Sequence, residues 1–327
     1  MEKGNEELPR RRLGRTDYEV TELSVGGWLG LLDDPQAPTV EKERAAIEAV
    51  RRAVDLGVNY FDTAPSYGGG GVAERHLGLG LRELGAEERG QLRVSTKVGT
   101  HPQRSQQYDR DSIRWSFERS QEVLGCEKID IIHVHDPSTD EKMDELMGAG
   151  GAVETLEGLK EEGVVGGIGL GVRVHRYLRR AIESGRFDVI LPSYDYHPIR
   201  GSLEPIIELA AERDVGVING SPYCAGLLAG LDPDVANGRR GNAEGDVRRG
   251  RAIWKWCRER DVDCGALAVQ YSLRNPKIAT ALTGPRTAAE GEGNFRHATE
   301  RLPEGIWEEL DSFLESLGPA PPGGEIE

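Results

Sequence analysis

The sequence has no long apolar run and few cysteines. None of its apolar stretches approaches the roughly 18 residues that a membrane helix requires, so we expect no membrane partner. Residues 1–14 are polar and lack the apolar segment of a secretory signal. The four cysteines are scattered, with neither the spacing of a metal site nor that of a disulfide framework. We therefore expect a folded protein of the reducing cytoplasm.

Basic residues are outnumbered by acidic ones, 41 to 56. The formal net charge is -15, which argues against nucleic acid as a partner. The basic run at 10–12 is short and is expected to be a solvated face. Only eight of the 41 basic residues are lysines, and the rest are arginines. A lysine at the end of an apolar run, as at Lys97, is therefore seldom expected by chance.

The chain also lacks a dinucleotide fingerprint. A doubly wound sheet normally carries G-x-G-x-x-G after its first strand, and no such run occurs. Instead, short apolar runs alternate with helical patterns. The expected strands are 23–27, 58–62, 92–97, 129–135, 164–170, 187–194, 215–222 and 277–284. The expected helices are 45–57, 72–84, 110–125, 152–163, 174–185 and 202–214, then a helical region at 247–274 and a helix pair within 287–317.

Eight strand–helix units predict an α/β fold, a closed (β/α)8 TIM barrel with extra C-terminal helices. A β-hairpin within 11–25 precedes the first strand. We expect residues 1–317 to form a single domain and residues 318–327 to be a disordered tail. The loops 136–150 and 229–248 are longer than a connection requires. Both follow strands, so either is a candidate lid on the active face.

Ionisable residues end three consecutive expected strands. Asp62 ends VNYFD, Lys97 ends LRVSTK and His135 ends IDIIHVH, while Tyr67 follows Asp62 in the next turn. Because such barrels carry their active sites at the carboxyl ends of the strands, we expect these four side chains to lie together. Pairing Asp62 with Lys97 would offset the cost of desolvating both. Tyr67 would then be an acid/base for carbonyl–alcohol interconversion.

The alternation of side chains along each strand supports a shared site. The polar residues that share a parity are Tyr60 with Asp62, Ser95 with Lys97, and His133 with His135. The residues of opposite parity are apolar: Phe61, Val94, Ile132 and Val134. We expect the polar set to face the barrel axis and the apolar set to face the helices.

Two other interpretations of these motifs remain open. The run H-V-H-D at 133–136 allows a metal site, because two histidines at a strand end can be ligands in barrel hydrolases. The other strand ends supply few further ligands, and we expect no metal. The four glycines at 68–71 could cradle a phosphate. Without a following Gly-Lys-Ser/Thr, they are better interpreted as a flexible entry to the next helix.

The combination of FDTAPSYGGG, STK, DIIHVHD and GSPYCAGLL resembles the aldo-keto reductases, over about residues 11–317. The resemblance implies a (β/α)8 barrel that binds NAD or NADP without a Rossmann fingerprint. It implies direct hydride transfer between nicotinamide and a carbonyl or alcohol carbon. Tyr67 is then the general acid/base, Lys97 lowers its pKa, Asp62 pairs with Lys97, and His135 orients the substrate oxygen.

By the same resemblance, GPRTAAEGEGN at 284–294 corresponds to the loop that holds the adenosine phosphate. Trp28 would line the mouth of the pocket or pack in the core. A basic residue often stands at the position of Glu290 in members that prefer NADP, so a carboxylate there predicts preference for NAD. The positions that the resemblance assigns to the cofactor are Gly27, Trp28, Asp62, Ser193, Ser221, Gly226, Gly284, Arg286, Glu290 and Asn294.

Three departures from the common family pattern resemble its sugar-oxidising branch, the galactose and threo-aldose dehydrogenases. Gly171-Val172 stand where many members have Ser-Asn, Ser193 where many have Gln, and Gly220 where many have Tyr. The implied partner is a small carbonyl compound or a sugar, with an aldose as a candidate substrate. The alternative is a regulatory subunit that binds nicotinamide with little turnover.

Overall fold

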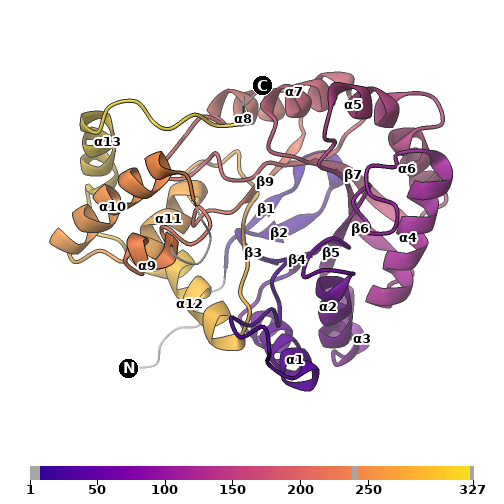
Figure 1. Ribbon diagram of the computed structural model, residues 1–327, viewed down its shortest axis with the longest axis horizontal. Helices are drawn as coiled ribbons and strands as arrows, with labels where there is room; N and C mark the ends of the chain where they lie inside the picture. Colours follow the sequence, from indigo (N-terminus) through magenta and orange to yellow (C-terminus); the bar gives the residue numbers. More distant parts are fainter. Residues whose placement is uncertain (1–7, 238–241, 325–327) are drawn as a thin grey trace.

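A closed barrel of eight parallel strands forms the centre of the molecule (Figure 1). The computed structural model describes residues 8–237 and 242–324 of the chain. Around the barrel, the order of the strands is β10-β3-β4-β5-β6-β7-β8-β9. Their bounds are β3 (Leu23–Gly26), β4 (Tyr60–Asp62), β5 (Arg93–Val98), β6 (Ile129–His135), β7 (Val165–Gly171), β8 (Val189–Leu191), β9 (Gly216–Gly220) and β10 (Thr280–Thr283).

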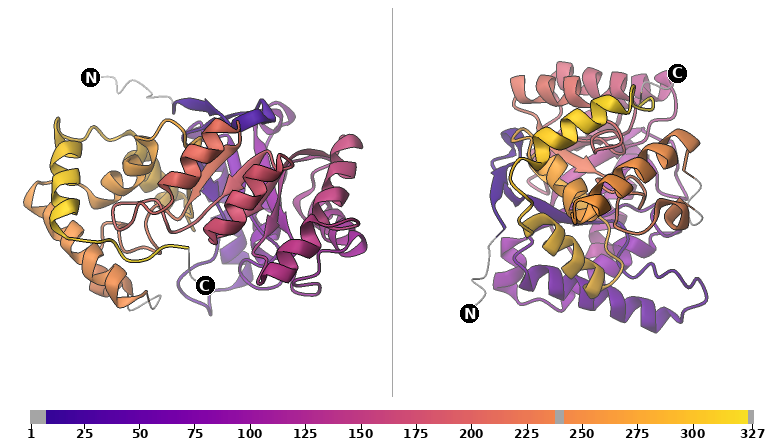
Figure 2. Two further views of the ribbon diagram at one scale, coloured as in Figure 1. Left: turned by 90° about the horizontal axis from the view of Figure 1, so that it is seen from above. Right: turned by 90° about the vertical axis from the view of Figure 1, so that its left-hand side faces the viewer.

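Helices surround the barrel and extend it on one side (Figures 1 and 2). Those of the first half are α1 (Thr39–Asp55), α2 (Val72–Arg82), α3 (Ala86–Gln91), α4 (Arg110–Leu124), α5 (Asp140–Met147), α6 (Ala152–Glu161), α7 (His175–Ser184) and α8 (Glu204–Glu212). Those of the second half are α9 (Pro233–Asn237), α10 (Glu244–Glu259), α11 (Cys264–Leu273), α12 (Ala288–Thr299) and α13 (Ile306–Ser316). No helix of the described residues is long and apolar enough to cross a membrane.

Local sequence explains where these helices begin and end, as α4 illustrates. The side chain of Asp109 accepts a hydrogen bond from the backbone N–H of Ser112 and so caps the first turn. Gly125 ends the helix in the left-handed conformation, with φ at 67°. Between them, Ile113 and Phe117 lie four residues apart and are buried against the barrel.

The barrel interior and the layer outside it have different side chains. The apolar cluster inside the barrel consists of Leu13, Val20, Tyr60, Ile131, Val189, Leu191, Ile218 and Ala279. Phe61, Val94, Ile132 and Val134 belong to a separate cluster between strands and helices. The predicted division by residue parity is therefore confirmed. The outer cluster is the main hydrophobic core of the fold.

A β-hairpin closes the amino-terminal end of the barrel. Strands β1 (Arg10–Arg12) and β2 (Glu19–Thr21) pair antiparallel and flank the short helix η1 (Gly14–Thr16). Leu13 and Val20 from this hairpin pack into the interior cluster, so the hairpin fills that end. The opposite end, where the strands have their carboxyl termini, is left for the functional site.

All eight predicted strands, the hairpin and the (β/α)8 barrel are confirmed. The long loop predicted at 136–150 contains α5, and the loop at 229–248 contains α9 and the start of α10. The helical region predicted at 247–274 is two helices, because residues 260–263 interrupt it. Helix α3 was not predicted.

The expectation of a disordered tail is wrong for residues 318–324. After α13 the chain crosses α10, where Arg249 Nη1 donates to the carbonyl of Gly318 (2.9 Å). Residues 318–324 continue from there to the start of α7 (Figure 1). There the N–H of His175 donates to the carbonyl of Gly324 (3.1 Å). Residues 325–327 lie outside the described residues.

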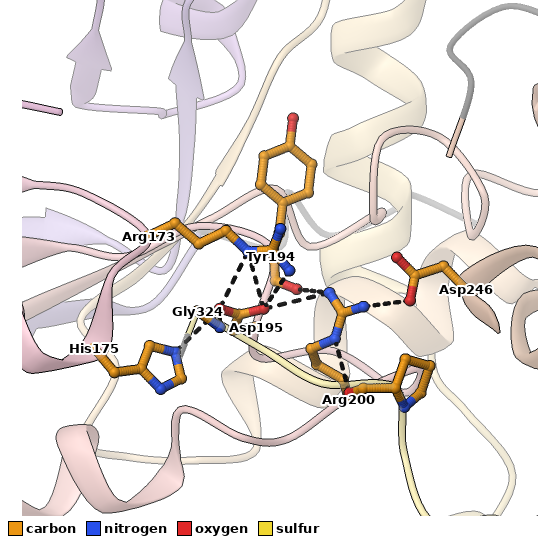
Figure 3. A network of polar contacts seen from close by, with 8 residues as sticks. Arg173, His175, Tyr194, Asp195, Arg200, Asp246 and Gly324 are labelled. Carbon is orange, nitrogen blue, oxygen red and sulfur yellow. Dashed lines mark hydrogen bonds and ion pairs between the residues drawn. The ribbon is translucent and has the colours of Figure 1, made fainter. Parts of the chain in front are cut away.

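A buried carboxylate holds the end of this tail (Figure 3). Asp195 Oδ2 accepts from the N–H of Gly324 (2.7 Å), and the guanidinium groups of Arg173 and Arg200 also donate to Asp195. Arg200, which is 3% exposed, further contacts Asp246 at the start of α10 and the carbonyl of Pro321. The cluster thus joins the ends of β7 and β8 to α10 and the tail.

The fit of the tail predicts the effect of a single methyl group. A Cβ at Gly324 would lie 1.9 Å from the carbonyl oxygen of Arg173, so Gly324→Ala should detach the tail and lower the free energy of unfolding by about 1 kcal/mol. Amide hydrogen exchange of residues 318–324 and thermal unfolding test this. Gly158→Ala is the matched control, because nothing lies within 4 Å of its Cβ and it stands inside α6. That change should stabilise the fold by about 0.5–1 kcal/mol. Unchanged exchange in Gly324→Ala would contradict the docked tail.

Candidate active site

A buried ion pair lies at the centre of the site. Lys97 Nζ is 2.5 Å from Asp62 Oδ2 and 2.8 Å from the carbonyl oxygen of Thr63, and the Lys97 and Asp62 side chains are each 1% exposed. The other carboxylate oxygen of Asp62 accepts from the hydroxyl of Ser95 at 2.6 Å. Adjacent positions in the barrel sheet place these groups together, because β4 pairs with β5. The predicted ion pair is thus present in the structure.

The pair keeps Lys97 charged inside the protein. Burial lowers the pKa of Lys97, but the negative charge of Asp62, the effect of Tyr67, the hydrogen bond to Asp62 and a smaller effect of Asp136 together raise the pKa by more, so it is raised overall. A charged ammonium without its carboxylate would be strongly unfavourable here. The site therefore holds a permanent positive charge at the carboxyl end of β5.

Tyr67 lies between Lys97 and His135. Lys97 Nζ is 5.1 Å from the centroid of the Tyr67 ring, and the Tyr67 and His135 rings meet edge to face with their centroids 5.9 Å apart. Burial raises the pKa of Tyr67, and the charge of Lys97 acts in the opposite direction. The pKa of Tyr67 is thus raised overall, and Lys97 lowers it against this effect of burial, in the direction that the resemblance implied. Gly27 makes room for the ring, since a Cβ there would be 2.9 Å from Tyr67 Cδ2.

The imidazole of His135 is fixed from both sides. The hydroxyl of Thr100 lies 2.8 Å from Nδ1, and a carboxylate oxygen of Asp136 lies 3.2 Å from Nε2. The backbone carbonyl of His135 accepts from the hydroxyl of Tyr108 at 2.8 Å. Gly99 allows this tyrosine to approach, because a Cβ at Gly99 would be 2.3 Å from the Tyr108 ring.

These contacts determine the tautomer of His135. Burial, with the charge of Lys97, holds the pKa of His135 well below its usual range, so the ring is neutral and carries one proton. A carboxylate only accepts hydrogen bonds, so the 3.2 Å contact of Asp136 with Nε2 favours the tautomer that carries the proton on Nε2. Nδ1 then accepts from the hydroxyl of Thr100. His135 can therefore donate a hydrogen bond toward the mouth of the barrel through Nε2.

Sequence reasoning did not find Thr100, Tyr108 or Asp136. Thr100 and Asp136 each lie within three residues of a predicted site residue, and this proximity to the strand ends was the available signal. Tyr108 gave no comparable signal, because its contact with His135 depends on the path of the loop after β5.

One group of predicted cofactor residues lies around the ends of β3 and β10. The N–H of Gly27 donates to the carbonyl of Asp62 at 2.9 Å. Trp28 is 45% exposed rather than part of the core, and a Cβ at Gly284 would be 2.5 Å from its indole ring. The N–H of Gly30 donates to the carbonyl of Arg286 (2.9 Å) and so links the two loops.

Glu290 engages Arg286 within this group. Glu290 Oε1 lies 2.5 Å from Arg286 Nη2, and the backbone N–H of Arg286 donates to Oε2 at 2.8 Å. Asp33 from the loop after β3 binds the same guanidinium. The positive charge that an adenosine phosphate would need is therefore already matched by two carboxylates.

A second group of predicted residues follows β8 and β9. Ser193 forms a bridge with Gly220, which places it at the carboxyl end of the sheet. Ser221 has a positive φ of 60° and begins the turn that contains Gly226, at φ 94°. Nothing lies within 4 Å of a Cβ at Gly226, so a ligand could approach this backbone. Asn294 is linked to this turn through its side-chain oxygen, which accepts from the hydroxyl of Tyr223 at 2.8 Å.

The exposed ring of Trp28 and the open backbone at Gly226 leave room for a ligand such as a nicotinamide dinucleotide beside the two groups. The rival metal interpretation has no such support. In residues 8–237 and 242–324, no group of three or more His, Cys, Asp or Glu side chains is placed to hold a metal ion. His133 is completely buried, and a Cβ at Gly169 would be 2.1 Å from its Nδ1, so its ring occupies the space that this glycine leaves.

The sequence of the chain is similar to those of several known dehydrogenases. The chain is 31% identical to L-galactose dehydrogenase of Arabidopsis thaliana, over 94% of this chain and 93% of the relative. It is 30% identical to D-threo-aldose 1-dehydrogenase of a Pseudomonas species, over 88% and 90% of the two chains. It is 28% identical to pyridoxal 4-dehydrogenase of Microbacterium luteolum, over 93% and 96%.

Comparison of folds gives the same architecture. A crystal structure described as an aldo-keto reductase of Pseudomonas aeruginosa superposes with a TM-score of 0.68 at 23% identity, covering 92% of this chain and 99% of the other. The sequence model of the Aldo/keto reductase family matches residues 22–315. The chain belongs to the aldo/keto reductase family and is an NAD(P)-dependent oxidoreductase.

Proposed function

We propose that the chain is an aldose 1-dehydrogenase in which Asp62, Tyr67, Lys97 and His135 carry the chemistry. The observation that carries the proposal is the position of the Tyr67 ring, beside the buried Lys97 ammonium and edge to face with His135. A proton donor, Tyr67, thus lies next to a positive charge, Lys97, and to a hydrogen-bond donor, His135. The similarity to two sugar dehydrogenases supports an aldose as the substrate, and the alternative of a regulatory subunit is not favoured.

The four residues divide the reaction between them. A nicotinamide bound at the barrel mouth would accept the hydride from C1 of the sugar or return it. Tyr67 takes the proton of the C1 hydroxyl in oxidation and gives it back in reduction. The charge of Lys97 favours the phenolate and so opposes the effect of burial on the pKa of Tyr67. His135 donates through Nε2 to the same substrate oxygen, and Asp62 keeps Lys97 in place and charged.

Arg286 and Glu290 support a preference for NAD. A 2′-phosphate would have to compete with Glu290 and Asp33 for the guanidinium, and it would be repelled by both carboxylates. A free ribose hydroxyl could instead donate to Glu290. We therefore propose NAD as the better cofactor.

Replacement of Tyr67 by phenylalanine tests the acid/base. Tyr67→Phe keeps the ring but removes the proton, so kcat for aldose oxidation and aldehyde reduction should fall by about 10²–10⁴. The assay is the absorbance of reduced nicotinamide with panels of aldoses and aldehydes. Tyr18→Phe, in the hairpin at the opposite end of the barrel, is the control and should keep its rate. Near wild-type turnover in Tyr67→Phe would show that another group moves the proton.

Thr100 offers a test of the His135 tautomer. Thr100→Val removes the hydroxyl while keeping the side-chain shape, so Nδ1 loses its donor and kcat should fall roughly tenfold. Thr100→Ser should restore most of the rate. The pH profile of kcat should also change in Thr100→Val, because the imidazole is no longer held in one protonation pattern. A rate equal to that of the wild type would mean that this hydrogen bond does not position His135 in turnover.

Glu290 offers a test of cofactor preference. Glu290→Gln removes the negative charge from Arg286, so the dissociation constant for NADPH should fall about tenfold relative to that for NADH. Fluorescence titration of both cofactors measures this ratio. Glu292→Gln is the control, because it removes the same charge from a neighbouring exposed residue that pairs with Arg52 instead. Equal or tighter binding of NADPH by the wild type would refute the preference for NAD.

A further inference from the structure

We propose that Asp136 determines substrate specificity by accepting a hydrogen bond from a hydroxyl on the carbon next to the reacting one. This inference rests on the proposed function, because it takes Tyr67 and His135 as the groups that hold the reacting oxygen. It goes further by naming the substrate class: compounds with a hydroxyl adjacent to the carbonyl, or diols of the same arrangement. Aldoses, with their C2 hydroxyl, belong to this class.

The carboxylate of Asp136 lies at the mouth of the site. Its Oδ2 is 3.2 Å from His135 Nε2, and its side chain is 60% exposed while that of His135 is 9% exposed. In the part of the chain that the structure describes, the Asp136 carboxylate has no other ion-pair partner and no side-chain hydrogen bond besides this contact. The group is therefore not part of a structural salt-bridge network. It faces the place from which a substrate must approach His135.

The backbone holds this carboxylate in position. Asp136 has φ at 41°, in the left-handed region that side chains disfavour, although aspartate tolerates it better than most residues. Its N–H donates to the carbonyl of Gly171 at 3.0 Å. Its own carbonyl accepts from Gln106 Nε2 at 2.8 Å. Two neighbouring segments thus fix a strained residue directly after His135, which is typical of functional positions.

Substrate binding changes the pairing of Asp136. In the free protein the Asp136 carboxylate lies 3.2 Å from His135 Nε2, so the tautomer with its proton on Nε2 places that proton nearest the carboxylate. When a substrate oxygen accepts a hydrogen bond from His135 Nε2, the Asp136 carboxylate loses its contact with that proton. A substrate without a further donor then places its own oxygen, which carries a partial negative charge, beside an unpaired carboxylate, and the two repel each other. A hydroxyl on the adjacent carbon donates to Asp136 and removes this penalty.

A site of this kind discriminates by hydrogen bonding rather than by size. Sites built to accept a hydrogen bond from a hydroxyl reject analogues that lack it much more strongly than apolar pockets reject a change of one methylene. The preference arises from the pairing of a charged group, so it should be sensitive to the charge of Asp136. If Asp136 only shaped this turn, both Asp136→Asn and Asp136→Gly should leave the preference for the hydroxylated substrate unchanged, because asparagine and glycine also tolerate a positive φ.

The experiment compares matched substrates in matched variants. Galactose and 2-deoxygalactose are oxidised with NAD or NADP, and lactaldehyde and propanal are reduced with the reduced cofactor. Each pair differs by one hydroxyl on the carbon next to the reacting one. We expect wild-type kcat/KM to favour the hydroxylated member, and Asp136→Asn and Asp136→Gly to reduce that ratio on the order of 10- to 100-fold. In both variants kcat/KM for propanal should rise, because the negative charge of the carboxylate is gone.

The controls separate this role from others. Glu141→Gln removes one exposed negative charge from the start of α5 and should leave the ratio unchanged. If the wild type shows no preference within either pair, or if both Asp136 variants lower both members equally, the proposal is wrong and Asp136 serves the fold or the His135 ring. If galactose is not oxidised, the aldose assignment fails, while lactaldehyde and propanal still decide the role of Asp136. Should Asp136→Gly not fold, Asp136→Asn alone gives the ratio.

Discussion

The ion pair between Asp62 and Lys97 is the constraint on which the site depends. Both groups are buried in the barrel, so each can keep its charge only while the other is within hydrogen-bond distance. Thr63 and Ser95 satisfy further hydrogen-bonding capacity of the pair, and Thr63 directly follows β4 while Ser95 lies in β5. The register of β4 on β5 is thereby coupled to the electrostatics of the site: a shift of one residue would turn these side chains toward the helices. The position of Tyr67 beside Lys97 follows from the same register.

A second charged cluster lies outside the barrel and has a different task. Asp195 receives two arginines, and one of them, Arg200, also binds Asp246. This cluster joins segments from different parts of the chain, namely the ends of β7 and β8, the start of α10 and the tail up to Gly324 (Figure 3). The ring of Tyr194 points away from these contacts in the same view. The inner pair therefore lies among the residues proposed for catalysis, whereas the outer cluster holds the segments after β7 and β8 against α10 and the tail.

The sequence predicted the parts of the structure that follow from local periodicity. Alternation along β6 was sufficient to place His135 and Ile132 on opposite faces, because a strand in a closed barrel has only an inside and an outside. The coincidence of charged residues at strand ends predicted that Asp62 would meet Lys97. The contact between His135 and Thr100 was not predictable in this way. It depends on how the loop after β5 turns back, and that path is set by packing of Tyr108 on Gly99.

The tail at residues 318–324 shows most clearly why composition led to a wrong prediction of disorder. A segment such as PAPPGGEIE is rich in proline and glycine, which in isolation indicates a chain without a core of its own. Gly323 and Gly324 are nevertheless required by close approach, since a Cβ at Gly323 would lie 2.1 Å from Ser202 Oγ. The partner of Gly324 is Asp195, 129 positions earlier in the chain. A local sequence pattern carries no information about a contact between residues so far apart in the chain. A local pattern was also insufficient for Asp136, because its proposed role depends on the position of its carboxylate opposite His135 Nε2.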